Sequence, residues 1–350
     1  MIQLYYRSSS LGAFDFCQMQ FYIVYGLGWR SPSQKKANLG TVVHKVLEVL
    51  ANFKLLTQES TQQSYAYKDE ELGEFNFTPK TLQSQKLVDE ILIRSYNHYT
   101  ASTPEISYTK ADFKFCADMV EACLRHDSGQ FDPRHQTILA PEKSFDLEIN
   151  EPWARVEYNG EIRQLRIKGT MDLITVPETG TIEYVDYKTG ARKNWATDEE
   201  KTYAKLHDDI QLLLYFYAIR KLYPEYKNII MTIFFLRDGG PFSLCFDDQD
   251  ETRFLKMLEK KFVEIKNCTQ PKPINPWRSG FKCEKLCHFY KNKWPGTDKT
   301  MCHHVEDTIK TYGIENATAK LSKPGFSIDY YSAPGSTDKG ENNADSKQEG

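Results

Sequence analysis

Residues 164–190 read QLRIKGTMDLITVPETGTIEYVDYKTG, and they determine the expected architecture. Apolar and β-branched residues dominate 164–176 and 181–187, and this composition predicts two strands. Thr179 and Gly180 lie between them and predict a turn. The stretch therefore predicts a hairpin.

Charged side chains interrupt this apolar hairpin at three positions. Asp172 lies in the first strand, and Asp186 and Lys188 lie in the second. Because side chains alternate along a strand, Asp186 and Lys188 point to one face and Tyr187 to the other. If the strands pair with Asp172 near Asp186, two carboxylates and an ammonium converge. Close carboxylates favour a cation between them, and Mg²⁺ and Mn²⁺ prefer oxygen ligands. Strand-end charges in solvent are the alternative, which the apolar neighbours of Asp172 disfavour.

The rest of the chain predicts helices around further strands. Helical patterns cover 9–25, 37–53, 80–99, 110–126, 205–223 and 250–266, and strand patterns cover 143–149, 229–236 and 242–246. Residues 58–77 are polar and predict a loop. We expect an α/β fold: a central mixed sheet flanked by helices, with an N-terminal helical part and a Cys-rich C-terminal wrap.

These patterns divide the sequence into four sections. We expect an N-terminal helical region at 1–130, a core at 131–270, a Cys-rich metal-binding region at 271–326 and a disordered tail at 327–350. The tail is rich in Ser, Gly, Asp and Asn, which supply little apolar surface to bury.

Composition and charge set broad limits on the class of protein. The chain has 350 residues, 40% of them hydrophobic, so it can bury a sizeable core. Its net charge of -3 does not exclude nucleic-acid binding, which depends on local basic patches. No apolar run approaches the ~20 residues that span a bilayer, and the first residues lack a signal-peptide pattern. We expect a cytoplasmic protein of a bacterium or a phage-infected host cell that does not bind membranes.

Two motifs flank the hairpin in the sequence. Gly40-Thr41-Val42-Val43-His44 lies in a predicted helix, and His44 is either a metal ligand or a packed polar residue. Gln211 and Tyr215 lie four residues apart on another predicted helix and therefore share one face. Glu142 precedes a predicted strand and is a further candidate carboxylate.

Gly169-Thr170-Met171-Asp172 and Asp186-Tyr187-Lys188-Thr189-Gly190 together resemble the PD-(D/E)XK nuclease superfamily. With the His44 and Gln211 motifs in this order, the chain is similar to the RecB-like branch, which includes nuclease domains of bacterial recombination helicase-nucleases and CRISPR-adaptation nucleases. The resemblance implies a restriction-endonuclease-like core and DNA hydrolysis that depends on Mg²⁺ or Mn²⁺. It implies these site residues: catalytic Asp172, Asp186, Lys188, Gln211 and Tyr215, and metal ligands His44, Asp172, Asp186 and the backbone carbonyl of Tyr187.

The resemblance further implies an exonuclease in recombination, repair or phage DNA metabolism, acting on single strands or duplex ends. The sequence has no P-loop, so a partner helicase or recombination protein would be a separate chain. One alternative is a non-catalytic DNA-binding or assembly subunit that keeps the fold. Another is a zinc-stabilised interaction module in which the acidic hairpin is incidental.

Four cysteines form a second constellation: Cys17, Cys283, Cys287 and Cys302. Several RecB-like nucleases place one cysteine before the histidine helix and three near the C-terminus, where they bind a [4Fe-4S] cluster. The gaps of three and fourteen residues between the last three depart from the usual pattern. His288, His303 and His304 lie nearby, so Zn²⁺ or no metal are the alternatives.

Basic residues follow the second strand of the hairpin. Arg192 and Lys193 can bind a phosphate backbone, and Trp195 can stack on a base. Arg163, Arg166 and Lys168 precede Asp172 and are candidates for the same role. A solvated charged surface is the alternative interpretation of all these cations.

Overall fold

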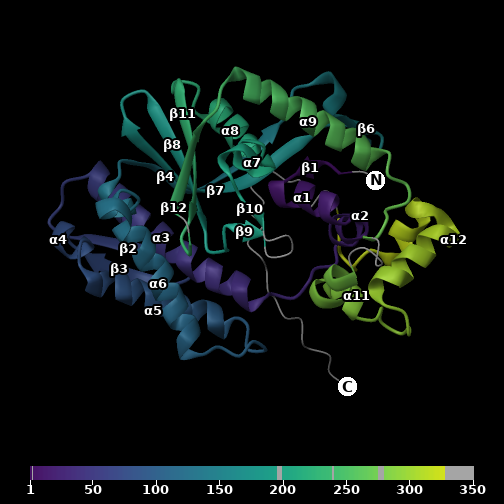
Figure 1. Ribbon diagram of the computed structural model, residues 1–350, viewed down its shortest axis with the longest axis horizontal. Coiled ribbons are helices and arrows are strands. Elements are labelled where there is room, and N and C mark those ends of the chain that lie inside the picture. The colour runs from purple at the N-terminus through teal and green to yellow at the C-terminus, as the bar shows by residue number, and fades with distance from the viewer. Residues whose placement is uncertain (2, 195–198, 239, 275–279, 328–350) are drawn as a thin grey trace. The chain divides into compact units, whose positions relative to one another are not determined.

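The computed structural model describes residues 1, 3–194, 199–238, 240–274 and 280–327, and Figure 1 shows how helices flank strands. The predicted disordered tail and Trp195 lie outside the described residues, apart from Ser327. No helix in the described ranges is long and apolar enough to cross a membrane.

A mixed six-stranded sheet is the centre of the fold. Its strands are β1 (Tyr5–Tyr6), β4 (Ile138–Glu148), β7 (Arg166–Glu178), β8 (Thr181–Lys188), β11 (Asn228–Phe235) and β12 (Gly240–Cys245). The order is β1-β7-β8-β11-β12, and β4 also pairs with β7. The β7–β8 and β11–β12 pairs are antiparallel, whereas β1–β7 and β8–β11 are parallel. The predicted α/β class with a mixed sheet and flanking helices is confirmed.

The predicted hairpin forms with the expected turn. β7 ends at Glu178 and β8 begins at Thr181, with Gly180 at φ +80° in the turn between them. The chain then crosses through α7 (Tyr203–His207) and α8 (Ile210–Leu222) to β11, which pairs parallel to β8. A helical crossover of this kind is what a parallel neighbour requires.

The remaining elements are mostly helical. The longer helices are α1 (Ser8–Phe16), α3 (Lys35–Glu59), α5 (Gln85–Ala101), α6 (Lys110–Arg125), α9 (Asp248–Lys266) and α12 (Met301–Leu321). The short helical segments are α2 (Gln18–Phe21), η1 (Tyr22–Gly26), α4 (Pro79–Leu82), η2 (His126–Gly129), η3 (Pro133–His135), η4 (Pro152–Ala154), η5 (Lys282–Leu286) and α11 (His288–Lys291). Small two-stranded sheets are formed by β2 (Tyr65–Asp69) with β3 (Gly73–Phe77), β5 (Arg155–Tyr158) with β6 (Glu161–Gln164), and β9 (Lys193–Asn194) with β10 (Glu199–Glu200).

Spatial contacts group the described chain into two compact units. Unit 1 contains Met1–Pro32, Phe145–Gly169 and the described residues from Asp248 onward, and unit 2 contains Ser33–Ser144 and Thr170–Asp247. Each unit has an apolar core of its own, built around Tyr22 and Val305 in unit 1 and around Val46 and Phe53 in unit 2. The four sections expected from the sequence are ranges along the chain, and they stay a prediction.

The loop expected at 58–77 is wrong, because β2 and β3 form a hairpin there. Tyr65, Phe75 and Phe77 are buried, and the rings of Phe75 and Phe77 lie 5.5 Å and 4.2 Å from that of Phe53. Lys68, Glu74 and Asn76 lie between these aromatic residues and are exposed, whereas Asp69 is buried. Packing against α3 therefore stabilises the β2–β3 hairpin, which the polar composition of the segment did not indicate.

The helix expected over 205–223 is interrupted. α7 ends at His207, and the side chain of Asp209 caps α8 by accepting a hydrogen bond of 2.9 Å from the Gln211 amide. An aspartate at this position begins a new helix more readily than it continues an old one. As a result, Gln211 lies in the first turn of α8.

Candidate active site

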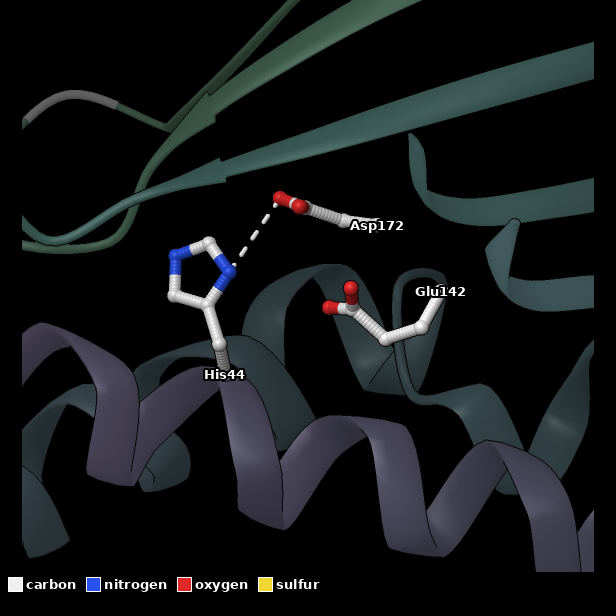
Figure 2. Close-up of side chains that lie close together, drawn as sticks. All are labelled: His44, Glu142 and Asp172. Atoms are coloured by element: carbon white, nitrogen blue, oxygen red, sulfur yellow. Dashed lines mark ion pairs between the residues drawn. The ribbon is translucent and has the colours of Figure 1, made fainter. Parts of the chain in front are cut away.

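Three side chains of unit 2 converge from separate elements. A ring nitrogen of His44 on α3, a carboxylate oxygen of Glu142 on β4 and one of Asp172 on β7 lie within 4.8 Å of one another. Figure 2 shows the imidazole and both carboxylates pointing toward one another between the helix and the strands. In the described part of the chain, no other three His, Cys, Asp or Glu side chains meet this distance.

Gly40 allows α3 to approach the end of the hairpin. A Cβ atom at this position would lie 3.0 Å from Oγ1 of Thr189, which follows Lys188 directly. His44 is one helical turn further along the same face. Gly40 therefore lets α3 lie close to the end of β8, and this brings His44 near Asp172.

The His44 imidazole is held in an acidic environment. Its Nδ1 lies 3.4 Å from Oδ2 of Asp172. Burial lowers the pKa of His44, but the charges of Asp172, Glu142 and Asp186 outweigh it and raise the pKa to about 9. At neutral pH the imidazolium thus supplies a positive charge that a metal ion would replace.

Glu142 enters the site through an unusual backbone conformation. Its φ of +41° is rare for a residue with a side chain, although the residue lies inside β4. Burial and the charge of Asp172 raise the pKa of its carboxyl to about 8, against the opposing charge of His44. Sequence reasoning named Glu142 only as a further carboxylate, because its backbone conformation has no signature in the residue pattern.

The Asp172 carboxylate is fixed by the second strand of the hairpin. Its Oδ2 accepts a hydrogen bond of 2.8 Å from the Tyr187 backbone amide. Burial raises the pKa of Asp172, but the charges of His44 and Lys188 and the Tyr187 amide reverse this effect and hold it below its usual range. The carboxylate is therefore ionised and oriented before any ligand binds.

Asp186 and Lys188 share a face of β8, as alternation predicts. Leu173 pairs with Val185, so the same register one residue further places Asp172 opposite Asp186. Nζ of Lys188 lies 2.7 Å from Oδ2 of Asp186, whose side chain is almost fully buried. Burial lowers the pKa of Lys188, but the charges of Asp186 and Asp172 raise it above its usual range.

Gln211 on α8 contacts both Asp186 and Lys188. Nε2 of Gln211 donates to Oδ1 of Asp186 at 2.9 Å, and its Oε1 accepts from Nζ of Lys188 at 3.1 Å. The Tyr215 ring lies on Tyr184, with ring centres 5.2 Å apart and planes at 88°. The structure thus brings Gln211 into contact with the charged pair, and Tyr215 into contact with a neighbour of that pair.

A family model described as the PD-(D/E)XK nuclease superfamily matches residues 8–290. The chain belongs to this superfamily. The match covers the His44, Asp172, Asp186, Lys188 and Gln211 positions, together with Glu142.

A solved structure is similar to this superfamily member, whereas no curated protein matches it. The crystal structure of a "Putative exonuclease" from Eubacterium rectale matches with a TM-score of 0.43 and 14% sequence identity. The match covers 77% of this chain and 84% of that one.

The residues of this PD-(D/E)XK chain fit a divalent cation. One imidazole and several carboxylates form a donor set suited to Mn²⁺ and Mg²⁺. In addition, Oδ2 of Asp186 is buried, and its one polar partner among the described residues is the Lys188 ammonium at 2.7 Å. Asp186 lies outside the group of three ligands, and its role as a ligand stays a prediction, as does that of the Tyr187 carbonyl.

The predicted nucleic-acid-binding residues of this superfamily member are paired with carboxylates. Arg192 forms an ion pair with Glu200, and Nζ of Lys193 lies 3.8 Å from another oxygen of the same carboxylate. The Arg192 amide donates to Asp238 at 3.0 Å. Arg166 pairs with Asp146 and Glu148 at 2.6 Å, and Lys168 pairs with Asp146 at 3.1 Å. Phosphate contact by these cations stays a prediction.

The four predicted cysteine ligands lie in unit 1, and their sulfur atoms form no compact group. No three of Cys17, Cys283, Cys287 and Cys302 bring their sulfur atoms within 4.8 Å of one another, although all four are described. Burial and the charges of the other three cysteines raise the pKa of Cys302. The divalent-cation prediction is thus supported at His44, Glu142 and Asp172, whereas nothing in the structure supports an iron-sulfur cluster.

Proposed function

We propose that this chain is a metal-dependent deoxyribonuclease whose cation binds at His44, Glu142 and Asp172. A single observation carries the proposal: the ligand atoms of these three residues lie within 4.8 Å of one another, on three separate elements. The charged pair Asp186–Lys188 lies on the strand next to Asp172. Membership of the PD-(D/E)XK superfamily supports phosphodiester hydrolysis as the reaction class.

The proposed chemistry divides between the cation and the protein. A divalent ion supplies Lewis acidity to a phosphate oxygen and lowers the pKa of a bound water. His44, Glu142 and Asp172 would hold the ion, with Asp186 as the predicted fourth protein ligand. Because Lys188 is an ammonium at neutral pH, it donates hydrogen bonds to water or phosphate and offsets developing negative charge.

The proposed substrate is DNA, attacked from strand ends. The ordered set of His44, Asp172, Asp186, Lys188 and Gln211 motifs supports the RecB-like branch, whose members include recombination nucleases. We infer a role in recombination, repair or phage DNA metabolism, with any helicase on a separate chain. The cytoplasm of a bacterium or an infected host is the proposed compartment.

Cleavage of end-labelled single- and double-stranded DNA, with and without Mn²⁺, tests the proposal. We expect Mn²⁺-dependent shortening of the DNA by the wild-type chain and none by Lys188→Ala. Equal cleavage by both proteins would contradict the assigned site. Mn²⁺ binding and DNA binding without cleavage would instead favour a non-catalytic subunit that keeps the fold. A circular substrate separates the modes, because an exonuclease leaves it intact.

We propose a separate structural metal at Cys17, Cys283, Cys287 and Cys302. All four lie in unit 1, and the resemblance favours a [4Fe-4S] cluster over Zn²⁺. Metal analysis of anaerobically purified protein distinguishes the two: iron with sulfide supports the cluster, zinc without iron contradicts it, and neither metal contradicts both. Cys245→Ser is the matched control for a serine substitution at any of these four cysteines, because Cys245 is exposed and outside the group.

A further inference from the structure

Tyr184 is a buried tyrosine that the nuclease motifs do not include. It lies on β8 two residues before Asp186, so both side chains share one face of the strand. Its side chain is fully buried, and its hydroxyl donates a hydrogen bond of 2.9 Å to Oδ1 of Asp186. A hydroxyl set into a buried strand thus has one clear partner, which is a carboxylate of the candidate active site.

The two oxygens of Asp186 have different partners. Oδ1 accepts from the Tyr184 hydroxyl and from Nε2 of Gln211, each at 2.9 Å. Oδ2 contacts the Lys188 ammonium at 2.7 Å and has no other polar partner among the described residues. A carboxylate rotates about its terminal bond unless hydrogen bonds fix it. The two donors on Oδ1 therefore determine which oxygen faces the charged side of the site.

Helix α8 holds both donors in place. Gln211 is in its first turn, and Tyr215 packs edge-on against the Tyr184 ring at 5.2 Å. Tyr215 is thereby connected to Asp186 through Tyr184. Through this contact, Tyr215 supports the ring whose hydroxyl donates to Asp186.

We propose that Tyr184 is a positioning residue: together with Gln211, its hydroxyl occupies Oδ1 of Asp186 and presents Oδ2 to the divalent cation. The inference rests on the proposed function of this site and adds a residue to it. Groups that orient a metal ligand typically change metal affinity by 10–100-fold when they are removed. A hydroxyl that served only packing would leave metal affinity unchanged.

The test is Tyr184→Phe, which removes the hydroxyl and keeps the ring against Tyr215. Mn²⁺ affinity is measured without DNA from the electron paramagnetic resonance signal of the free ion. We expect affinity to fall by about 10-fold or more, and kcat for DNA to fall at saturating Mn²⁺ with KM for DNA unchanged. Unchanged Mn²⁺ affinity and kcat would overturn the proposal.

The matched control is Tyr65→Phe in the same unit. Tyr65 is also buried, and its hydroxyl donates to the Ser60 carbonyl at 2.5 Å, away from the carboxylates. This variant loses that bond and the one that the hydroxyl accepts from the Gln62 amide at 2.9 Å, both far in the sequence from the metal ligands, so it should keep wild-type Mn²⁺ affinity and kcat. A loss of Mn²⁺ affinity equal to that of Tyr184→Phe would show a general effect of destabilisation and overturn the proposal.

Gln211→Ala is the second variant, and it tests the same proposal if Tyr184→Phe does not fold. It removes the other donor to Oδ1, so it should weaken Mn²⁺ binding as well, and unchanged affinity would overturn the proposal. In the double variant the two losses should be non-additive, because both donors act on one oxygen.

The result is distinguishable from failure of the proposed function. A wild-type chain that binds Mn²⁺ but does not cleave DNA would contradict the nuclease proposal, while the affinity comparison would still decide the role of Tyr184. A wild-type chain that binds no Mn²⁺ would overturn both.

Discussion

Lys188 is the cation around which the residues of the site are arranged. Its ammonium contacts Asp186 at 2.7 Å and Gln211 at 3.1 Å. Because neighbouring carboxylates raise its pKa above the ordinary value, it is protonated at neutral pH. It is therefore a hydrogen-bond donor and a source of positive charge, and it does not serve as a general base.

Replacing Lys188 by Met should abolish most of the activity without abolishing metal binding. The change removes a charge that stabilises the reacting phosphate, and the loss of one such donor lowers kcat by about 10²–10³. Rate measurements at saturating Mn²⁺ check this. Lys114→Met is the control, because Lys114 is exposed on α6 and pairs only with Asp118 among the described residues. Similar losses in both variants would contradict the assignment.

Mn²⁺ affinity should rise with pH between neutrality and about 9. The pKa of Glu142 is raised to about 8 and that of His44 to about 9, so both are largely protonated at neutral pH. A metal ion must displace these protons, and it competes better as the proton concentration falls. Titrations of Mn²⁺ binding across this range check the trend. Affinity that does not vary with pH would contradict it.

Without divalent ions, stability should fall over the same pH range. His44 has a folded-state pKa above its unfolded value of 6.5, so its contribution is complete below 6.5 and lost as pH rises through about 9. Glu142 is stabilised in its protonated form, and that contribution is lost as pH rises from 4.5 through about 8. Thermal unfolding with EDTA and with Mn²⁺ should diverge as pH rises, because the cation replaces the lost protons.

At the scale of elements, α3 carries His44 toward the end of the hairpin. Gly40→Ala would place a Cβ atom 3.0 Å from Oγ1 of Thr189 and displace the helix or the threonine. We expect weaker Mn²⁺ binding and slower cleavage with little loss of stability, since alanine favours helix by about 1 kcal/mol.

Removing the opposing hydroxyl tests this mechanism. Gly40→Ala combined with Thr189→Ala should recover Mn²⁺ binding, because the close approach is relieved. Gly12→Ala on α1 is the control, as its Cβ would have nothing within 4 Å. Full activity of Gly40→Ala alone would show that the approach of α3 has no bearing on the site.

Lys45 connects α3 to the β2–β3 hairpin. Its buried ammonium lies 2.8 Å from Asp69, 3.2 Å from Glu71 and 3.3 Å from Glu48. Lys45→Met removes the ion pair of the buried Asp69 carboxylate and leaves it only the Glu71 and Leu72 amides, so it should cost about 3–5 kcal/mol. Urea unfolding measures this loss. Adding Asp69→Asn should recover part of it, and a double variant no more stable than the single one would contradict the pairing.

His44 and Asp172 were candidates from the sequence, but the grouping of Glu142 with them was not predicted. The β7–β8 hairpin and the shared face of Asp186 and Lys188 follow from local alternation, which one strand encodes by itself. Glu142 depends on a left-handed backbone within β4, and β2–β3 depends on packing against Phe53. Both are tertiary effects, so the local pattern carries little sign of them.

At the scale of the whole molecule, the α/β class was predictable because helices and strands alternate with clear periodicities. The grouping of the chain into two units was harder to predict from the sequence. Unit 1 combines three segments distant in the sequence, including both ends of the described chain. Contacts of that kind leave no periodic signal, and Cys17, Cys283, Cys287 and Cys302 can be recognised as a set only by resemblance.

The central claim is that a divalent cation binds among His44, Glu142 and Asp172. A crystal structure with Mn²⁺, using the anomalous scattering of manganese, tests it most directly. The account predicts an anomalous peak within bonding distance of the His44 ring nitrogen and of both carboxylates. A manganese peak at other residues, with these three side chains unchanged, would contradict it.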